Sequence, residues 1–335
     1  MILPNKPFRV EFEIINKCNL NCIYCYAKPF DSFTPNIKKL EYLFEKTKIE
    51  VNPFEVVLIG GEPFMRKDAV TVFELAHKIF DMSIGISTNA TLLNKLSARD
   101  LNIMHYLSTN NAISLQVSID TINYKINNST RGLTHLSTSG IDLLEKNNIK
   151  FGIGIVMTSI NKLDIQDTIK NLMLTYKNLN SINLEPLQPS LQMDQDKYVK
   201  LKLSYNDTYE IYNEVIGIAK EIRRNDINIT KLSECQTAQT LLDSYGFKTC
   251  NAGLLRSGVL ANGDVVPCVI LRNIILGNLH KDSWDVIWNK SKERFITLNN
   301  SGIQTTVGQC NLVNILRREE RSTINSAFRT KITSS

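Results

Sequence analysis

The sequence predicts an α/β protein in which a parallel sheet of repeated strand–helix units is followed by a smaller α+β region. Short apolar, β-branched runs alternate with segments of helical periodicity from residue 8 to about residue 225. Several runs are apolar throughout, as in Val56–Ile59, which is expected of parallel strands covered on both faces. The alternation stops beyond residue 225, where four of the seven cysteines follow. Alternation of this kind predicts right-handed β-α-β units.

Six strands and six helices are predicted in chain order. The strands are Arg9–Ile15, Glu55–Ile59, Ser83–Ser87, Ile113–Ile119, Phe151–Met157 and Ser181–Glu185. The helices are Asn36–Lys48, Lys67–Phe80, Asn94–Leu107, Ser137–Asn147, Ile165–Leu179 and Tyr205–Arg224. We expect residues 1–200 to form the first domain, residues 201–234 a linking helical region, and residues 235–335 an auxiliary domain that ends in a polar tail.

Composition limits the class of protein and of partner. The chain has 335 residues, of which 43% are hydrophobic, and this is enough for a large core. Its formal net charge is +6, but no run of Lys and Arg predicts a nucleic-acid partner. No apolar stretch is long enough to span a membrane, and Met1–Lys6 lacks the apolar core of a signal peptide. We therefore expect a cytoplasmic protein with neither a nucleic-acid nor a membrane partner.

Three cysteines directly after the first predicted strand form the most informative motif. Cys18, Cys22 and Cys25 are spaced four and then three residues apart. A short loop can aim three thiolates at one [4Fe–4S] cluster; four cysteines normally close such a cluster, so three leave one iron open to chemistry. A zinc site would need a second cysteine pair or histidines, and the first histidine is His77. A disulfide is not expected in an unsecreted chain with an odd number of cysteines.

The Cys-x3-Cys-x2-Cys motif, with Tyr24 directly before the third cysteine, resembles the signature of the radical S-adenosylmethionine (radical SAM) enzymes. The resemblance implies a partial (β/α)6 TIM-like barrel, with the cysteines at the carboxyl end of the first strand, where function collects in such barrels. It also implies that the open iron chelates the amino and carboxylate groups of S-adenosylmethionine (AdoMet). Reductive cleavage, with electrons from a donor such as flavodoxin or ferredoxin, then gives a 5′-deoxyadenosyl radical that abstracts a substrate hydrogen.

A glycine-rich block follows the second predicted strand. Gly60, Gly61 and Glu62, with Pro63 after them, resemble the family's GGEP motif. Glycine permits a close approach of the backbone to a ligand and a positive φ. The resemblance implies that this block contacts the amino group of AdoMet. A tight turn between a strand and a helix is the alternative interpretation.

Polar residues at the carboxyl ends of the third and fourth strands are further candidates for cofactor contacts. Ser87 and Asn89 lie at the end of the third strand, and Ser118 and Asp120 at the end of the fourth. The resemblance places the latter two near the ribose and the methionine part of AdoMet, and Arg131 against its carboxylate. A planar guanidinium matches a carboxylate through two hydrogen bonds. The alternative is that these are polar strand ends and a solvated surface arginine.

The fifth and sixth strands add weaker candidates. Gly152 and Gly154 would leave room for the adenine ring beside the fifth strand, and Asn161 follows shortly after it. Glu185 ends the sixth strand, where it would be a substrate ligand, a base or a solvated strand end.

The C-terminal third contains a hairpin signal and two of the remaining cysteines. Asn262-Gly263 between two apolar runs predicts a type I′ turn, with Cys268 on the second strand and Cys250 before the first. The pattern Cys-x12-Gly-x4-Cys resembles the opening of the SPASM or twitch extension of radical SAM enzymes. The segment from Gly277 to Trp288 resembles the same extension.

The resemblance implies an auxiliary [4Fe–4S] cluster in this extension. Its expected ligands are Cys250, Cys268, Cys310 and, as the fourth, Cys235. The chain lacks the further cysteines of a full SPASM domain, so we expect one auxiliary cluster and not two. Two other interpretations stay open: Cys235 would be a free thiol that returns a hydrogen atom to a substrate radical, or the cysteines would be buried as small hydrophobic residues.

Three hypotheses for function follow. The resemblance makes maturation of a ribosomally made peptide the first, with a crosslink, a thioether or an epimerised residue as the product. Dehydrogenation of a small alcohol or sugar is the second, with the auxiliary cluster as electron acceptor. The third is an iron–sulfur binding or regulatory protein without radical chemistry, and the intact Gly-Gly-Glu-Pro block argues against it.

Overall fold

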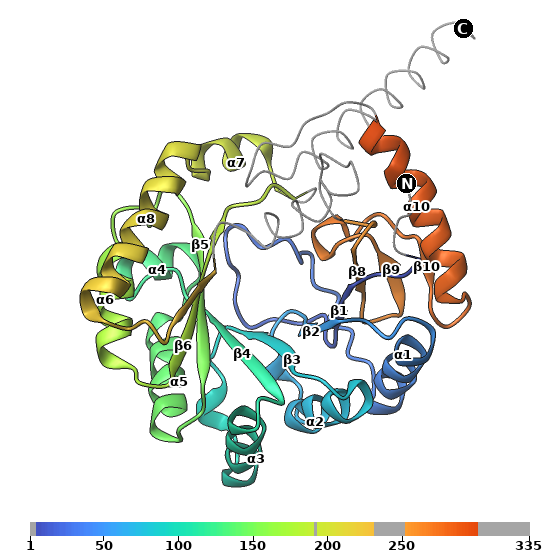
Figure 1. The fold of residues 1–335 in the computed structure, drawn as a ribbon, viewed down its shortest axis with the longest axis horizontal. Coiled ribbons are helices and arrows are strands. Elements are labelled where there is room, and N and C mark those ends of the chain that lie inside the picture. The colour runs from blue at the N-terminus through green and yellow to red at the C-terminus, as the bar shows by residue number, and fades with distance from the viewer. Residues whose placement is uncertain (1–4, 191–192, 231–251, 301–335) are drawn as a thin grey trace, which may run out of the picture.

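One ten-stranded sheet organises the residues that the computed structural model describes, which are 5–190, 193–230 and 252–300 (Figure 1). The strand order is β10-β9-β8-β1-β2-β3-β4-β5-β6-β7. Neighbouring strands are parallel from β8 to β7 and antiparallel between β8, β9 and β10. The helices lie outside the strands, which curve around the long segment between β1 and α1 (Figure 1).

The bounds of the elements are as follows. The strands are β1 Arg9–Glu13, β2 Glu55–Ile59, β3 Ile84–Thr88, β4 Ile113–Ser118, β5 Phe151–Met157, β6 Leu179–Pro186, β7 Asn228–Thr230, β8 Arg256–Val259, β9 Asp264–Val266 and β10 Gly277–Asn278. The α-helices are α1 Ile37–Glu50, α2 Ala69–Phe80, α3 Ala98–Thr109, α4 Tyr124–Thr130, α5 Thr134–Lys146, α6 Ile165–Thr175, α7 Gln195–Leu201, α8 Tyr205–Ile222 and α10 Trp284–Asn300. Short 3₁₀ helices are η1 Pro63–Met65, η2 Leu93–Lys95 and η3 Val269–Leu271.

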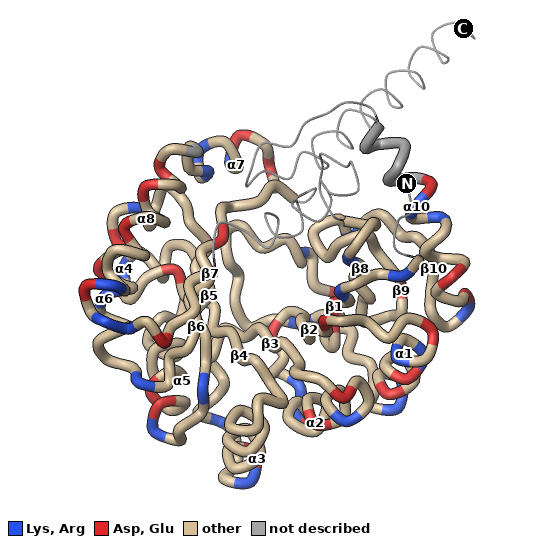
Figure 2. The backbone as a smooth tube through the Cα atoms, in the orientation of Figure 1, with Lys and Arg blue, Asp and Glu red and all other residues tan. Residues whose placement is uncertain are grey.

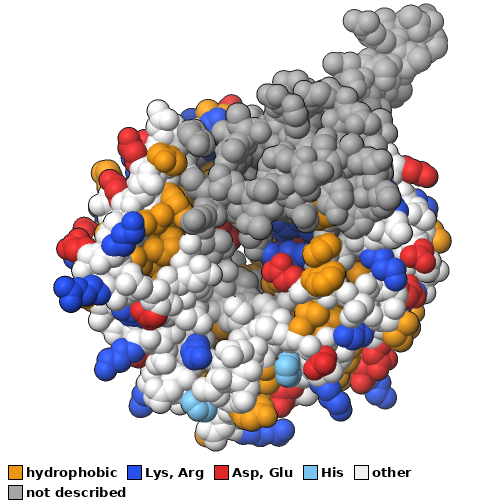
Figure 3. All heavy atoms as spheres, viewed as in Figure 1, with side chains coloured by type: hydrophobic (Ala, Val, Ile, Leu, Met, Phe, Trp, Pro, Cys, Tyr) orange, Lys and Arg blue, Asp and Glu red, His pale blue; other side chains and the backbone are white. Residues whose placement is uncertain are grey.

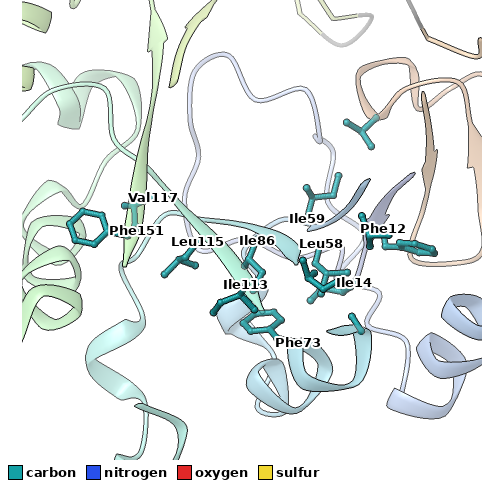
Figure 4. Close-up of a cluster of buried hydrophobic side chains, with 14 of the residues drawn as sticks. Phe12, Ile14, Leu58, Ile59, Phe73, Ile86, Ile113, Leu115, Val117 and Phe151 are labelled. Atoms are coloured by element: carbon teal, nitrogen blue, oxygen red, sulfur yellow. The ribbon is translucent and has the colours of Figure 1, made fainter. Parts of the chain in front are cut away.

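The hydrophobic core lies between the sheet and the helices. Phe12 of β1 meets Phe44 of α1 edge-on, with ring centroids 4.9 Å apart, and lies 5.9 Å from Phe80 of α2. Figure 4 shows the same layer continuing along the sheet through Leu58, Ile86, Ile113, Leu115, Val117 and Phe151. Each fully buried side chain of this kind stabilises the fold by about 1.5–3 kcal/mol. The strand–helix packing therefore fixes which face of each strand points inward.

The first strand presents charged side chains to the inside of the barrel. Val10 and Phe12 are buried in the core against the helices. Side chains alternate along a strand, so Arg9, Glu11 and Glu13 face the opposite way. Figure 2 shows the resulting acidic and basic positions close together along β1 and β8.

The predicted α/β fold with six strand–helix units is confirmed. β2 and β5 coincide with their predictions end to end, whereas the predicted helix ending at Leu179 stops at Thr175 because Leu179 already begins β6. α4 and α7, of seven residues each, and β7, of three, were not predicted. Elements this short do not complete enough periods for a pattern to emerge.

The predicted C-terminal hairpin is confirmed, but it continues the barrel sheet. β8 pairs in parallel with β1, with Arg256 opposite Arg9, and β9 pairs antiparallel with β8. Upstream, α8 packs on α6 and β7 pairs with β6. The domain boundaries proposed at residues 200 and 235 stay predictions.

Two details of the hairpin prediction were wrong. A type I′ turn needs positive φ at both central residues, but Asn262 does not have a positive φ and Gly263 does, at 88°. The turn is instead closed by the N–H of Gly263, which donates to the carbonyl of Leu260 at 2.8 Å. Cys268 lies beyond β9, immediately before η3, and not on the second strand.

Within the described ranges, no helix combines the length and the apolar character needed to cross a membrane.

Candidate active site

The three N-terminal cysteines lie in the segment between β1 and α1, residues 14–36, which we name the cysteine loop. Backbone contacts with the glycine block hold its start: the N–H of Gly61 donates to the carbonyl of Ile15 at 2.9 Å, and the N–H of Glu62 to that of Lys17 at 2.8 Å. A Cβ atom on Gly61 would lie 2.0 Å from the carbonyl oxygen of Lys17, and one on Gly60 2.5 Å from that of Ile15. The glycines therefore let the backbone approach the cysteine loop.

This corrects one expectation about the glycine block. Neither Gly60 nor Gly61 has a positive φ. The reason for glycine here is space, because two chain segments approach one another more closely than any side chain permits. Their contact with AdoMet stays a prediction.

The thiols of the cysteine loop are half-buried and not bonded to one another. The N–H of Leu20 points at Sγ of Cys18 at 3.4 Å, and the carbonyl of Cys22 accepts from the N–H of Cys25 at 3.3 Å. Burial raises the pKa of Cys18 to about 11 and also raises the pKa of Cys22, although Arg131 opposes that change. Iron binding to these thiols would therefore release their protons.

The donor set fits an iron–sulfur cubane better than a single metal ion. In the part of the chain that the structure describes, no three Cys, His, Asp or Glu side chains converge as ligands of one ion would. In a cubane each thiolate binds a different iron, so the thiols surround the cluster and do not meet at a point. Three soft thiolates are the ligand type that iron–sulfur clusters take, and Cys18, Cys22 and Cys25 would hold it.

Glu62 joins the glycine block to the end of β3. Its carboxylate is 1% exposed and accepts hydrogen bonds from the N–H of Phe64 at 3.1 Å, the hydroxyl of Thr88 at 2.6 Å and the N–H of Asn89 at 2.7 Å. Burial raises the pKa of Glu62 to about 7, although these three donors oppose the change. The carboxylate thus fixes β2 against β3 beneath the cysteine loop.

Asn89 supports the cysteine loop from the other side. Its amide N–H donates to Oδ1 of Asn19 at 3.0 Å and lies 3.9 Å from Sγ of Cys18. The side-chain oxygen Oδ1 of Asn89 accepts from the backbone N–H and the hydroxyl of Thr91, at 2.9 and 2.6 Å. The hydroxyl oxygen of Thr91 in turn accepts from the side-chain amide of Asn19 at 2.8 Å. The residue was predicted from the sequence, but its partners Asn19 and Thr91 were missed.

A cluster of three side chains, which we name the rim clamp, joins the cysteine loop to β4 and β5. The carboxylate of Asp120 is fully buried and accepts hydrogen bonds from the hydroxyl of Tyr24 and from Nε of Arg131, the latter at 2.8 Å. The N–H of Val156 donates to the same carboxylate at 3.2 Å. The guanidinium of Arg131 lies 5.4 Å from the centroid of the Tyr24 ring. Sequence reasoning named all three clamp residues but not their mutual contacts.

Burial and neighbouring charges set the pKa values of Arg131 and Tyr24 in the rim clamp. Burial lowers the pKa of Arg131, but Asp120 together with Tyr24 and Cys22 outweighs burial and holds that pKa above its usual value. Burial, reinforced by Asp120, raises the pKa of Tyr24 well above its usual value, so the phenol stays protonated and donates. Tyr24 also packs in a hydrophobic cluster with Leu187 and with residues of α7.

The remaining predicted contacts are polar groups on the inner face of the sheet. Ser87 and Ser118 are half-buried at the carboxyl ends of β3 and β4, and neither hydroxyl has a hydrogen-bond partner among the described residues. Ser118 lies opposite Gly154 of β5. A Cβ atom on Gly154 would lie 2.1 Å from the amide nitrogen of Gln116. The space directly beside Gly154 is thus occupied by the Gln116 side chain, and an adenine contact along β5 stays a prediction.

Two other predicted residues are engaged in the protein itself. Asn161 is fully buried, accepts from Thr158 at 2.8 Å and donates to the carbonyls of Asp120 and Val156. It therefore braces the backbone, and a cofactor contact at this residue stays a prediction. Glu185 is exposed at the end of β6 and accepts from Asn183 at 2.7 Å.

Tyr26, which the sequence did not single out, lies where the two halves of the barrel meet. Burial raises its pKa, and Glu11, Cys25, Cys268 and Glu185 act in the same direction. These four groups come from β1, the cysteine loop, the segment after β9 and β6. Tyr26 therefore senses the charges of the cysteine loop and of the segment around Cys268 at once.

Ion pairs of two buried glutamates join β1 to β8 and to the residue after η3, and we name them the β1 seam. Glu11 accepts from Arg9 at 2.9 Å and from Arg256 at 2.5 Å, while Glu13 accepts from Arg272 at 2.7 Å. Arg256 and Arg9 outweigh the effect of burial and lower the pKa of Glu11. Figure 3 shows acidic and basic side chains beside the hollow at the centre of this face.

The C-terminal cysteines are only partly placed. Cys268 is buried, with 6% of its surface exposed. Cys235, Cys250 and Cys310 lie outside the described residues, so their predicted roles as cluster ligands or hydrogen-atom donor stay predictions.

Family models account for both parts of the chain. A model of the radical SAM superfamily matches residues 12–172, from β1 into α6, and includes the cysteine loop, the glycine block and the rim clamp. The chain belongs to the radical SAM superfamily. A model of an iron–sulfur cluster-binding domain, SPASM, matches residues 250–311. This radical SAM protein therefore uses a [4Fe–4S] cluster and AdoMet, and its SPASM domain adds an iron–sulfur cluster.

Among curated relatives, the radical SAM chain is 29% identical to the uncharacterized protein MJ0907 of Methanocaldococcus jannaschii over 198 residues, covering 53% of this chain and 62% of that protein. It is 23% identical to the GTP 3′,8-cyclase of Campylobacter jejuni subsp. doylei over 319 residues, covering 85% and 94% of the two chains. The first alignment thus spans less than two thirds of its relative.

Solved structures share the radical SAM fold. Streptococcus suis SuiB bound to precursor peptide SuiA superposes with a TM-score of 0.68 at 18% identity, covering 85% of this chain and 65% of SuiB. The anSMEcpe structure with bound AdoMet and the Cp18Cys peptide gives a TM-score of 0.64 at 20% identity, covering 86% and 82% of the two chains. At these identities the similarity is one of fold.

Proposed function

We propose that this radical SAM enzyme modifies a ribosomally made peptide, by abstracting a hydrogen atom from one of its residues. Two solved relatives of the same fold, SuiB and anSMEcpe, were crystallised with peptides. A crosslink, a thioether or an epimerised residue would be the product, and an external one-electron donor would supply the reducing electron. Within this proposal, Ser87, Ser118 and Arg131 contact AdoMet, and Glu185 faces the substrate.

The observation that carries the proposal is the pairing of the arginines inside the barrel. The related GTP cyclase makes a nucleoside triphosphate the main competing substrate. A triphosphate needs several cations whose charge is not already neutralised. Here Arg9 and Arg256 bind Glu11, and Arg272 binds Glu13, at 2.5–2.9 Å. Because these three arginines of the described residues are already paired, this side of the lumen suits an uncharged or mixed-charge peptide segment better than a polyanion.

Transfer of deuterium distinguishes the substrate classes. The reconstituted, reduced enzyme is incubated with AdoMet and either tryptic peptides from cells grown in heavy water or perdeuterated GTP, and 5′-deoxyadenosine is analysed by mass spectrometry. We expect a mass increase with the peptide pool and none with GTP. Transfer from GTP and not from peptides would overturn the peptide assignment.

A matched variant tests the radical SAM chemistry separately. Cys22→Ala removes one of three thiolates from the predicted cluster site and should abolish 5′-deoxyadenosine formation with either substrate. Cys268→Ala should leave at least the basal cleavage of AdoMet, because Cys268 does not belong to the cysteine loop. Unchanged cleavage in Cys22→Ala would contradict the assignment of the cysteine loop.

A further inference from the structure

Asp120 cannot touch AdoMet directly in this arrangement. Its side chain is 0% exposed, and its two carboxylate oxygens already accept from Tyr24, Arg131 and the N–H of Val156. Its backbone is fixed as well, because its N–H donates to Asn127 at 2.9 Å. If Asp120 affects the binding of AdoMet, as the sequence predicts, it does so through the residues that it contacts.

The carboxylate instead determines where two other groups point. It binds Nε of Arg131, which leaves the four N–H groups on the two terminal nitrogens of the guanidinium for other acceptors. The guanidinium also lies over the ring of Tyr24 and acts electrostatically on Cys22. The guanidinium of Arg131 thus faces the cysteine loop at Tyr24.

The same carboxylate holds the cysteine loop. Tyr24 lies between Cys22 and Cys25, so its bond to Asp120 ties the middle of the motif to β4. The neighbouring N–H of Ile23 donates to the carbonyl of Thr130 at 2.9 Å, which is the residue before Arg131. Two bonds therefore dock the segment between two cysteines against one short stretch of chain.

We propose that Asp120 is a positioning residue, which orders the Cys22–Cys25 segment through Tyr24 and orients Arg131 for the carboxylate of AdoMet. A buried negative charge is retained here because it is paired with Arg131 and hydrogen-bonded by Tyr24. The proposal goes beyond the choice of substrate, because it concerns cluster and AdoMet binding whatever molecule is modified.

Thiol reactivity in the full-length, iron-free protein tests the first half of the proposal. Asp120→Asn keeps the shape but places an amide N–H against a donor, and Tyr24→Phe removes only the hydroxyl. Both should raise the rate at which iodoacetamide alkylates Cys22 on the order of tenfold. This is the change expected when a hydrogen bond to a charged acceptor is lost. The rate at Cys268, which lies outside the rim clamp, should not change. Because both variants remove the same bond, the double variant should be no faster than Asp120→Asn.

AdoMet affinity of the reconstituted protein tests the second half. Asp120→Asn and Arg131→Gln should each weaken AdoMet binding in equilibrium dialysis on the order of tenfold, and combining them should add nothing. Tyr24→Phe should weaken binding less, because Arg131 keeps its carboxylate partner. If Asp120→Asn failed to fold, the Tyr24→Phe alkylation rate would decide the matter. Alkylation and AdoMet affinity within twofold of the parent in the folded variants would overturn the proposal, even if their melting temperatures fell.

Discussion

The rim clamp and the β1 seam both pair a buried carboxylate with arginine, but they are assembled from different parts of the chain. In the rim clamp, Asp120 pairs with Arg131 at a separation of 11 residues. In the β1 seam, Glu11 pairs with Arg256 at a separation of 245, and Glu13 with Arg272 at 259. The comparison teaches that the catalytic rim can be organised largely within the first half of the chain, whereas placing Cys268 requires the two ends to meet.

The largest effect should come from removing the central charge of the β1 seam. Glu11→Ala removes the buried carboxylate that the half-buried side chains of Arg9 and Arg256 share, so we expect the free energy of unfolding to fall by about 3–5 kcal/mol. Denaturant unfolding followed by circular dichroism measures this. The control is Glu55→Ala, which removes a half-exposed partner of Arg9 at 3.1 Å and should cost less than about 1 kcal/mol. Equal losses in both variants would mean that the seam is no more important than a surface pair.

A smaller effect is expected at the other end of the seam. Glu13→Gln removes the charge that faces Arg272 at 2.7 Å, and the loss should be about 2–3 kcal/mol. Because Arg272 follows Cys268 by four residues, alkylation of Cys268 should accelerate while that of Cys22 stays constant. Faster alkylation of both cysteines would show that the β1 seam and the rim clamp unfold as one unit. The two regions would then not be independent.

Tyr24→Phe is the corresponding substitution in the rim clamp, and it should destabilise the fold less than Glu13→Gln. The ring keeps its packing against Leu187 and its contact with Arg131, and only the hydrogen bond to Asp120 is lost. We expect the free energy of unfolding to fall by about 1.5 kcal/mol in the same assay. Alkylation of Cys22 should accelerate, and the alkylation rate of Cys268 should not change. A larger loss of unfolding free energy than that of Glu13→Gln would mean that the rim clamp stabilises the fold more than the β1 seam does.

The smallest and most gradual effect is the pH dependence of the seam. Since the folded pKa of Glu11 is lowered from an unfolded value of 4.5, its ionised form stabilises the folded state above about that pH. This contribution is lost as the pH falls through the folded pKa. Melting temperatures of the parent and of Glu11→Gln should therefore converge in acid. A constant difference between them from pH 7 to pH 3 would contradict the lowered pKa.

Local patterns sufficed for the features that depend on neighbours in the chain. The cysteine spacing, the glycine block and the end-to-end bounds of β2 and β5 all follow from short stretches of sequence. The role of the glycines was less accessible. Their need for space arises from Ile15 and Lys17, which are more than forty residues away in the chain and are brought close only by the pairing of β1 with β2.

The sequence by itself determined the superfamily, the cysteine motif and the order of the first six strands and most of their helices, because each depends on residue type at short spacing. Only the tertiary structure decided that Asp120 is enclosed by Tyr24 and Arg131, and that the hairpin completes the barrel sheet beside β1. The physical reason is that a carboxylate has the same sequence signature whether it faces a ligand or a buried arginine. Burial and partners, which distinguish the two, come from segments that meet only when the chain folds.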